Sequence, residues 1–139
     1  MYEKILLAAD GSKNSIRAAK EAIKIASLIQ NCLIEVVYVA DFAKAKSDIL
    51  HSKGKEELDF SRRQKLLPLE EQLKSHNVTY EVKILHGEPG PAIVDYANKE
   101  KFDLVIIGSR GLNTLQEMVL GSVSHKVMKR VNCPALIVK

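Results

Sequence analysis

The chain has 139 residues, of which 46% are hydrophobic and 27% charged, with a formal net charge of +4. This composition is typical of a globular protein and excludes a disordered chain or a coiled coil, and the length predicts one domain over residues 1–139. No apolar run approaches the ~20 residues that cross a bilayer, and the first apolar run is too short for a secretory leader, so we expect a cytoplasmic protein without membrane contact. Four Tyr, three Phe and no Trp argue against nucleic-acid binding.

The first elements of the chain are a strand and a helix. Residues 5–9 form a continuous apolar run, as in a strand that is covered on both faces, and the turn Asp10-Gly11-Ser12 ends it. Apolar residues then recur at spacings of three and four through residues 16–26, with charged residues between them. This period predicts an amphipathic helix, and Ser12 is placed to cap its start.

The middle of the chain predicts a strand, a loop, a helix and a second strand. Residues 33–39 are rich in β-branched side chains, whereas residues 41–55 lose all period and gather Lys, Ser and Gly, which predicts a mobile loop. From Glu56 onward, leucines on one face predict a helix, in which Pro68 either introduces a kink or marks the true start. Residues 80–84 alternate between polar and apolar, which is typical of a strand near a sheet edge.

The last third repeats the alternation. A turn at residues 87–91 places proline at the start of a helix over residues 93–97, and residues 104–107 predict another buried strand. A glycine-punctuated loop, a helix near residues 122–130 and a strand at residues 135–138 follow. Such alternation requires right-handed crossovers, so we expect an α/β fold with an open parallel five-stranded sheet and helices on both faces.

Two glycine-bearing turns are placed to flank one crevice. Ligands of such sheets bind beyond the carboxyl ends of strands, where Gly108-Ser109-Arg110-Gly111 follows a buried strand. Gly121 and Ser122 come nine residues later and open a helix. Backbone N–H groups at that helix start, together with the hydroxyls of Ser122 and Ser124, predict an anion cradle suited to phosphates. Each fragment alone also fits a plain tight turn or a helix cap.

Two charged residues are candidates beside this cradle. Asp10, at the end of the first strand, suits a ribose hydroxyl or a Mg²⁺ ion held on phosphates, besides a capping role at the first helix. Arg110 matches phosphate oxygens in pairs, and a solvent-facing arginine fits the pattern equally well. Cys32 and Cys133 lack the spacing of a metal or redox motif, which predicts two buried thiols and no disulfide.

The arrangement G-x-x-G, nine residues, then G-S resembles the signature of the universal stress protein family, in its ATP-binding branch. Gly108, Gly111, Gly121 and Ser122 match it in full, and the resemblance extends to the opening and closing strands and covers nearly the whole chain. It implies a Rossmann-like sheet of the adenine nucleotide alpha hydrolase type, with strand order 3-2-1-4-5.

The resemblance also implies a ligand and a partner. Adenine would lie beside the second strand, ribose and phosphates near Asp10, and the triphosphate of ATP, with or without Mg²⁺, over the glycine loop. A second copy of the chain would pair along the last strand, Ala135 to Val138. Tyr38 stands where members of the family often have histidine, which leaves open which nucleotide base is preferred. The motif and the resemblance together give the expected nucleotide-binding residues: Ala8, Ala9, Asp10, Val39, Ile107, Gly108, Arg110, Gly111, Gly121, Ser122, Val123 and Ser124.

The expected function is that of a nucleotide-responsive switch in a stress response, read by a protein partner that the sequence does not identify. Slow or absent hydrolysis is expected because the chain has neither a G-K-[ST] lysine nor an evident second acidic ligand, and no catalytic residue is assigned. A phosphoacceptor receiver is disfavoured because His86-Gly87 stands where that class needs an acid. The remaining alternative is a dimeric interaction module that works without nucleotide.

Overall fold

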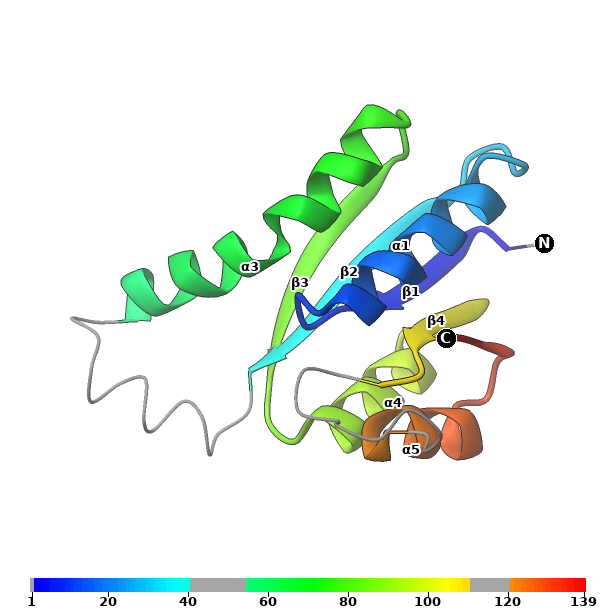
Figure 1. The fold of residues 1–139 in the computed structure, drawn as a ribbon. Coiled ribbons are helices and arrows are strands. Elements are labelled where there is room, and N and C mark those ends of the chain that lie inside the picture. The colour runs from blue at the N-terminus through cyan, green and yellow to red at the C-terminus, as the bar shows by residue number, and fades with distance from the viewer. Residues whose placement is uncertain (1, 41–54, 111–120) are drawn as a thin grey trace.

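The structure is a computed structural model that describes residues 2–40, 55–110 and 121–139. Within these ranges the chain forms a parallel sheet in the order β3-β2-β1-β4-β5, which confirms the predicted fold (Figure 1). The order reverses between β1 and β4, which are neighbours. The strands are β1 (Lys4–Ala8), β2 (Leu33–Ala40), β3 (Tyr80–His86), β4 (Leu104–Gly108) and β5 (Ala135–Val138); the helices are α1 (Lys13–Ala26), α3 (Lys55–Ser75), α4 (Pro89–Lys99) and α5 (Ser122–Arg130).

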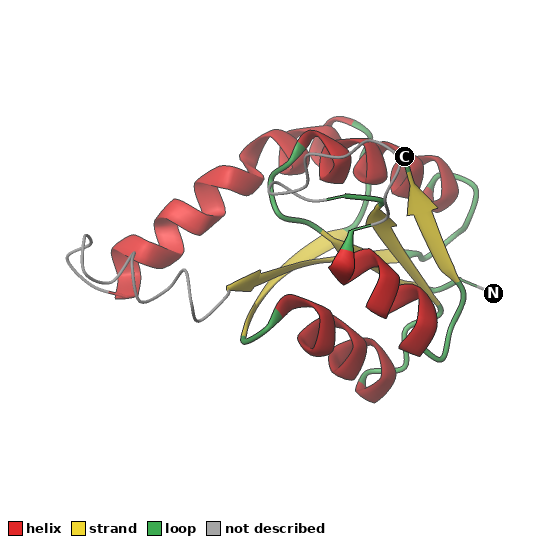
Figure 2. Cartoon of the chain, turned by 60° about the horizontal axis from the view of Figure 1, so that its bottom comes forward, coloured by secondary structure: helices red, strands yellow, loops and turns green. Residues whose placement is uncertain are grey.

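Two apolar clusters join the sheet to its helices in three layers, and Figure 2 shows strands with helices on both sides. Alternate residues of each strand point to opposite faces, so successive residues of β1 serve different clusters. Ile5 and Leu7 pack with α1 and α3, whereas Leu6 and Ala8 pack with α4 and α5. The central strands are therefore buried on both sides, as their continuous apolar runs predict.

Helix α1 begins where Ser12 caps it, as expected. The Ser12 hydroxyl accepts a hydrogen bond from the Ser15 N–H at 3.2 Å, and the Ser15 hydroxyl donates to the Ser12 carbonyl at 2.9 Å. Such caps satisfy first-turn N–H groups that have no partner within the helix. Small side chains form much of the buried face of α1, which lets the helix lie close to the sheet; they are Ala18, Ala19, Ala22 and Ala26.

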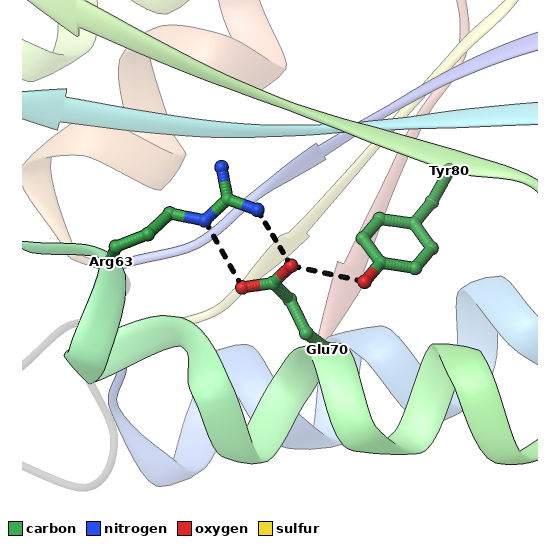
Figure 3. A network of polar contacts seen from close by, with 3 residues as sticks. All are labelled: Arg63, Glu70 and Tyr80. Carbon is green, nitrogen blue, oxygen red and sulfur yellow. Dashed lines mark hydrogen bonds and ion pairs between the residues drawn. The ribbon is translucent and has the colours of Figure 1, made fainter. Parts of the chain in front are cut away.

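Helix α3 begins at Lys55 and runs through Pro68, so Pro68 does not mark its start. In both ribbon views the N-terminal half of α3 extends past the carboxyl end of β2 (Figures 1 and 2). The C-terminal half is fixed to β3 by a polar network (Figure 3). Arg63 donates two hydrogen bonds to the Glu70 carboxylate, at 2.9 and 3.3 Å, and the Tyr80 hydroxyl donates a third at 3.0 Å. Three charge-assisted bonds thereby offset the burial of Glu70, whose side chain is 4% exposed.

A second buried carboxylate lies on the opposite face of the sheet. Glu35 of β2 is 7% exposed and accepts a hydrogen bond from the Tyr96 hydroxyl of α4. The Tyr96 ring also packs against Phe102, with ring centroids 5.6 Å apart. This pair anchors α4 to the sheet far from the carboxyl ends of the strands.

Other expectations about the chain have mixed outcomes. Both cysteines are free thiols, as predicted, with Cys32 buried and Cys133 only partly so. Strand β3 is an edge of the sheet, as the alternation of polar and apolar residues at 80–84 predicts. Of the loop expected at residues 41–55, residues 41–54 lie outside the described residues, and Lys55 already belongs to α3. Across the described ranges, no helix combines the length and the hydropathy needed to span a bilayer.

Candidate functional site

The end of β1 is shaped by a tight turn into α1. The Ala9 N–H donates to the Val37 carbonyl of β2 at 3.0 Å, which continues the sheet by one residue. Asp10 then accepts a hydrogen bond on Oδ1 from the Ser12 N–H at 2.9 Å. Its carboxylate therefore stabilises the turn. This role is additional to the predicted contact with ribose or Mg²⁺.

Gly11 completes this turn for two physical reasons. Its φ of +83° lies in the left-handed region that glycine adopts without strain. A Cβ at this position would also lie 3.1 Å from the Lys65 carbonyl oxygen and 3.2 Å from the Lys65 Cβ, because α3 passes close to the turn. Lys65 was not predicted for the site, since the sequence carries no signal for this contact.

The end of β4 is packed against the first turn of α1. A Cβ at Gly108 would lie 2.9 Å from the Asn14 Cβ and 3.1 Å from the Asn14 carbonyl oxygen. Gly108 does not have a positive φ. Glycine is therefore required at this position by close packing and not by an unusual backbone conformation. Asn14 was also missed from the sequence; the one available signal was a polar residue on the buried, alanine-rich face of a helix.

The start of α5 is fixed to the end of β4. The Gly121 N–H donates to the Ser109 carbonyl at 2.8 Å, and the buried Ser124 hydroxyl donates to the Gly108 carbonyl at 2.5 Å. The Ser124 hydroxyl thus joins helix to strand, while its backbone N–H belongs to the first turn. Gly121 is the N-cap, with φ −61° and ψ 152°, and no side chain among the described residues caps this helix.

This uncapped helix start gives the site its electrostatic character. The first intrahelical hydrogen bond runs from the His125 N–H to the Gly121 carbonyl, at 2.9 Å. The N–H groups of Ser122, Val123 and Ser124 precede it and have no acceptor within the helix. Together with the helix dipole, three such donors are suited to bind an anion such as a phosphate.

Four of the predicted residues meet in one apolar cluster at this edge of the sheet. Ala8 and Ile107 are buried in it, and Val39 and Val123 pack against it while partly exposed. They come from β1, β4, β2 and α5, so the cluster joins the ends of three strands to the start of α5. Ala9 points to the other face, where it packs with α1 and α3.

Two predicted residues are less closely defined. Gly111 lies outside the described residues. Arg110 is the last described residue after β4, and it is partly exposed and engaged in an interaction. The described residues contain no group of three or more His, Cys, Asp or Glu that could hold a metal ion.

Comparison with known proteins matches the full length of the chain to one protein family. Residues 1–139 match the universal stress protein family. Universal stress protein MJ0531 of Methanocaldococcus jannaschii is 33% identical, over 100% of this chain and 83% of that protein. The solved structure of MJ0577, from the same organism, is 31% identical with a TM-score of 0.85 and covers 100% of this chain and 96% of that one.

A third similar protein was solved with a ligand. This universal stress protein, in complex with cAMP, is 26% identical, has a TM-score of 0.71, and covers 99% of this chain and 96% of that chain. The full-length match to the family, the two relatives above 30% identity and the shared strand order agree with the glycine motif at residues 108–122. The chain therefore belongs to the universal stress protein family.

Proposed function

We propose that this protein binds an adenine nucleotide, with ATP as the expected ligand, in the crevice beyond the carboxyl ends of β1 and β4. The start of α5 carries the proposal, because its first N–H groups have no acceptor within the helix and no side-chain cap among the described residues. Two hydrogen bonds fix this helix start beside the point where strand order reverses. The similar protein solved with cAMP supports a nucleotide as the ligand.

Each part of the ligand has a counterpart in the crevice. The phosphates would accept hydrogen bonds from the N–H groups of Ser122, Val123 and Ser124. The adenine ring would lie against the partly exposed edge of the apolar cluster, at Val39 and Val123. Asp10 would accept a ribose hydroxyl or bind Mg²⁺ on the phosphates, since Mg²⁺ on a nucleotide commonly takes only one or two protein carboxylates. Bound there, Mg²⁺ would offset the negative charge of the triphosphate.

The protein acts in this proposal as a nucleotide-responsive switch in a stress response, with slow or no hydrolysis. Efficient hydrolysis requires a positioned base or water-orienting group and a securely held metal. Asp10, the acidic candidate at the proposed crevice, already accepts the Ser12 N–H. A switch needs only that two states of the protein differ in affinity for the nucleotide.

Thermal unfolding with a series of nucleotides tests this proposal. A ligand at 100 times its Kd stabilises the folded state by about 2.7 kcal/mol, so ATP with Mg²⁺ is expected to raise the melting temperature clearly. Asp10→Asn is the informative variant, because its side-chain oxygen still accepts the Ser12 N–H while the charge is lost. If Asp10 binds Mg²⁺, only the Mg²⁺-dependent part of the shift disappears; if it binds ribose, the shift with AMP falls as well. No shift with any adenine nucleotide at millimolar concentration contradicts the proposal.

A second candidate function is a dimeric interaction module that works without nucleotide. All four residues of β5 are partly exposed, and within the described ranges this strand pairs only with β4. Its outer backbone groups can therefore pair with the same strand of a second copy. A homodimer mass at micromolar concentration that does not change with nucleotide, in a protein that binds none, would favour this candidate.

A further inference from the structure

The outward face of α1 carries a row of cations. Lys13, Arg17, Lys20 and Lys24 follow one another at steps of four, three and four residues, and all four side chains are exposed. At about 100° per residue these positions fall within an arc of about 60°, along about 16 Å of helix. We call these four residues the cationic row. The buried face of α1 lies on the opposite side, against the sheet.

Within α1 itself, little acidic charge balances the cationic row. Glu21 is the only acidic residue of α1, and it pairs with Lys24 at 3.0 Å, at the C-terminal end. The first turn of α1 contains no acidic residue. Lys13 instead occupies that turn, where the helix dipole favours negative charge. The cations at this end therefore oppose the stability of their own helix, as is common where a surface serves binding.

Arg17 at this end is held in place by a buried partner. Its guanidinium donates a hydrogen bond to the Asn14 side-chain oxygen, and Asn14 is 8% exposed and packs against Gly108. A guanidinium held in this way has less conformational freedom to lose on binding, and its remaining N–H groups match the two oxygens of a carboxylate. The cationic row thus contains a pre-positioned carboxylate-binding group.

We propose that the cationic row is a docking surface for an acidic segment of another protein chain. The segment presents carboxylates at spacings that follow α1, with one of them paired to Arg17. Figure 1 shows α1 lying along the sheet beside α3, with its outward side clear of the other helices and strands. The proposal is independent of the nucleotide, since none of the four cations belongs to the proposed crevice.

Three other anionic partners fit this surface less well. A helix binds a membrane surface more strongly when an exposed apolar face adds to its charge, and the apolar face of α1 is buried against the sheet. Single-stranded nucleic acid is usually held by aromatic residues between the cations, and α1 contains no aromatic residue. A duplex groove admits a protruding helix, whereas α1 lies flat in a layer beside α3.

Fluorescence anisotropy with a labelled peptide tests the proposal. The probe is an alanine-rich helical peptide with Glu at steps of four, three and four residues, and its control has Gln at the same positions. Arg17→Gln/Lys20→Gln is compared with Lys129→Gln/Arg130→Gln, which removes the same two charge types from exposed positions of α5. We expect the Glu peptide to bind in low salt and the α1 variant to lose roughly fivefold in affinity, with the α5 variant unchanged.

Three results would overturn the proposal. Equal losses in both variants would show general attraction to a basic protein and no specific row. Equal binding of the Gln peptide would exclude carboxylate recognition. Tighter binding of a single-stranded oligonucleotide of the same charge would assign the row to nucleic acid. Neither variant changes a buried residue, so both are expected to keep the fold. Circular dichroism of both variants checks this.

Discussion

Gly108→Ala tests the packing that joins β4 to α1 beneath the proposed crevice. The new Cβ would lie 2.9 Å from the Asn14 Cβ and 3.1 Å from the Asn14 carbonyl oxygen. Ordinary contacts of this kind lie at about 3.5–4.0 Å, so the strand and the helix must separate by about half an ångström. The Asn14 backbone belongs to the first turn of a capped helix and cannot turn aside as a flexible side chain would.

The magnitude follows from two opposing effects. Overpacking of a well-filled site costs about 1–3 kcal/mol. Where φ is not positive, replacing glycine by alanine stabilises the folded protein by about 0.4–1 kcal/mol, because the unfolded chain loses conformational freedom. We therefore expect a net destabilisation of about 1–2 kcal/mol, measured by urea unfolding, and a melting temperature lower by about 3–8 °C.

A double-mutant cycle isolates the contact. Asn14→Gly removes the atom closest to the new Cβ, so Gly108→Ala should cost about 1 kcal/mol less in that background than in the wild type. A Gly108→Ala protein that equals or exceeds the wild type in stability would refute the reasoning. It would mean that β4 and α1 are not in the close contact that places the Asp10 turn beside α5.

Two further predictions concern the buried carboxylates. Tyr80→Phe removes the hydroxyl that donates to Glu70 and should lower the free energy of unfolding by about 1 kcal/mol, seen as a lower urea midpoint with an unchanged m-value; an unchanged midpoint would show that Arg63 alone satisfies the carboxylate. Burial, the hydrogen bond to Glu35 and nearby carboxylates raise the pKa of Tyr96 well above its ordinary value. The neutral hydroxyl therefore stabilises the fold below pH ~10, and this contribution is lost as pH rises further. Tyr96→Phe should show a smaller loss of stability than the wild type between pH 9 and 11, and parallel curves would contradict the assignment.

The sequence predicted those parts of the fold that depend on local patterns. The continuous run at residues 5–9 indicated a buried strand, and Ser12 before an alternation of period 3.6 indicated a capped helix. The strand order came from the resemblance that the glycine motif suggested. Pro68 left two predictions open, a kink or the start of a helix, because proline disfavours a helix interior without excluding it. The helix α3 runs from Lys55 through Pro68, so a start at Pro68 is excluded.

The contacts that position the site were not predictable in the same way. Gly108 meets Asn14, and Gly11 meets Lys65, across long separations in the sequence. Periodicity identifies which face of a helix is buried but does not indicate which residue of another element lies opposite. Glu35 and Tyr96 are a similar case, since neither residue reveals its partner 61 positions away.

Calorimetric titration with ATP and Mg²⁺ tests the central claim most directly. The protein is first unfolded and refolded to remove any carried-over ligand, and Gly121→Val is titrated beside it. Valine is compatible with the Gly121 backbone, at φ −61° and ψ 152°, so the variant should fold while its side chain fills the phosphate position. Saturable binding by the wild type that is lost in Gly121→Val is the predicted result. Absence of binding by the refolded wild type, or equal binding by both proteins, would contradict a nucleotide site at the start of α5.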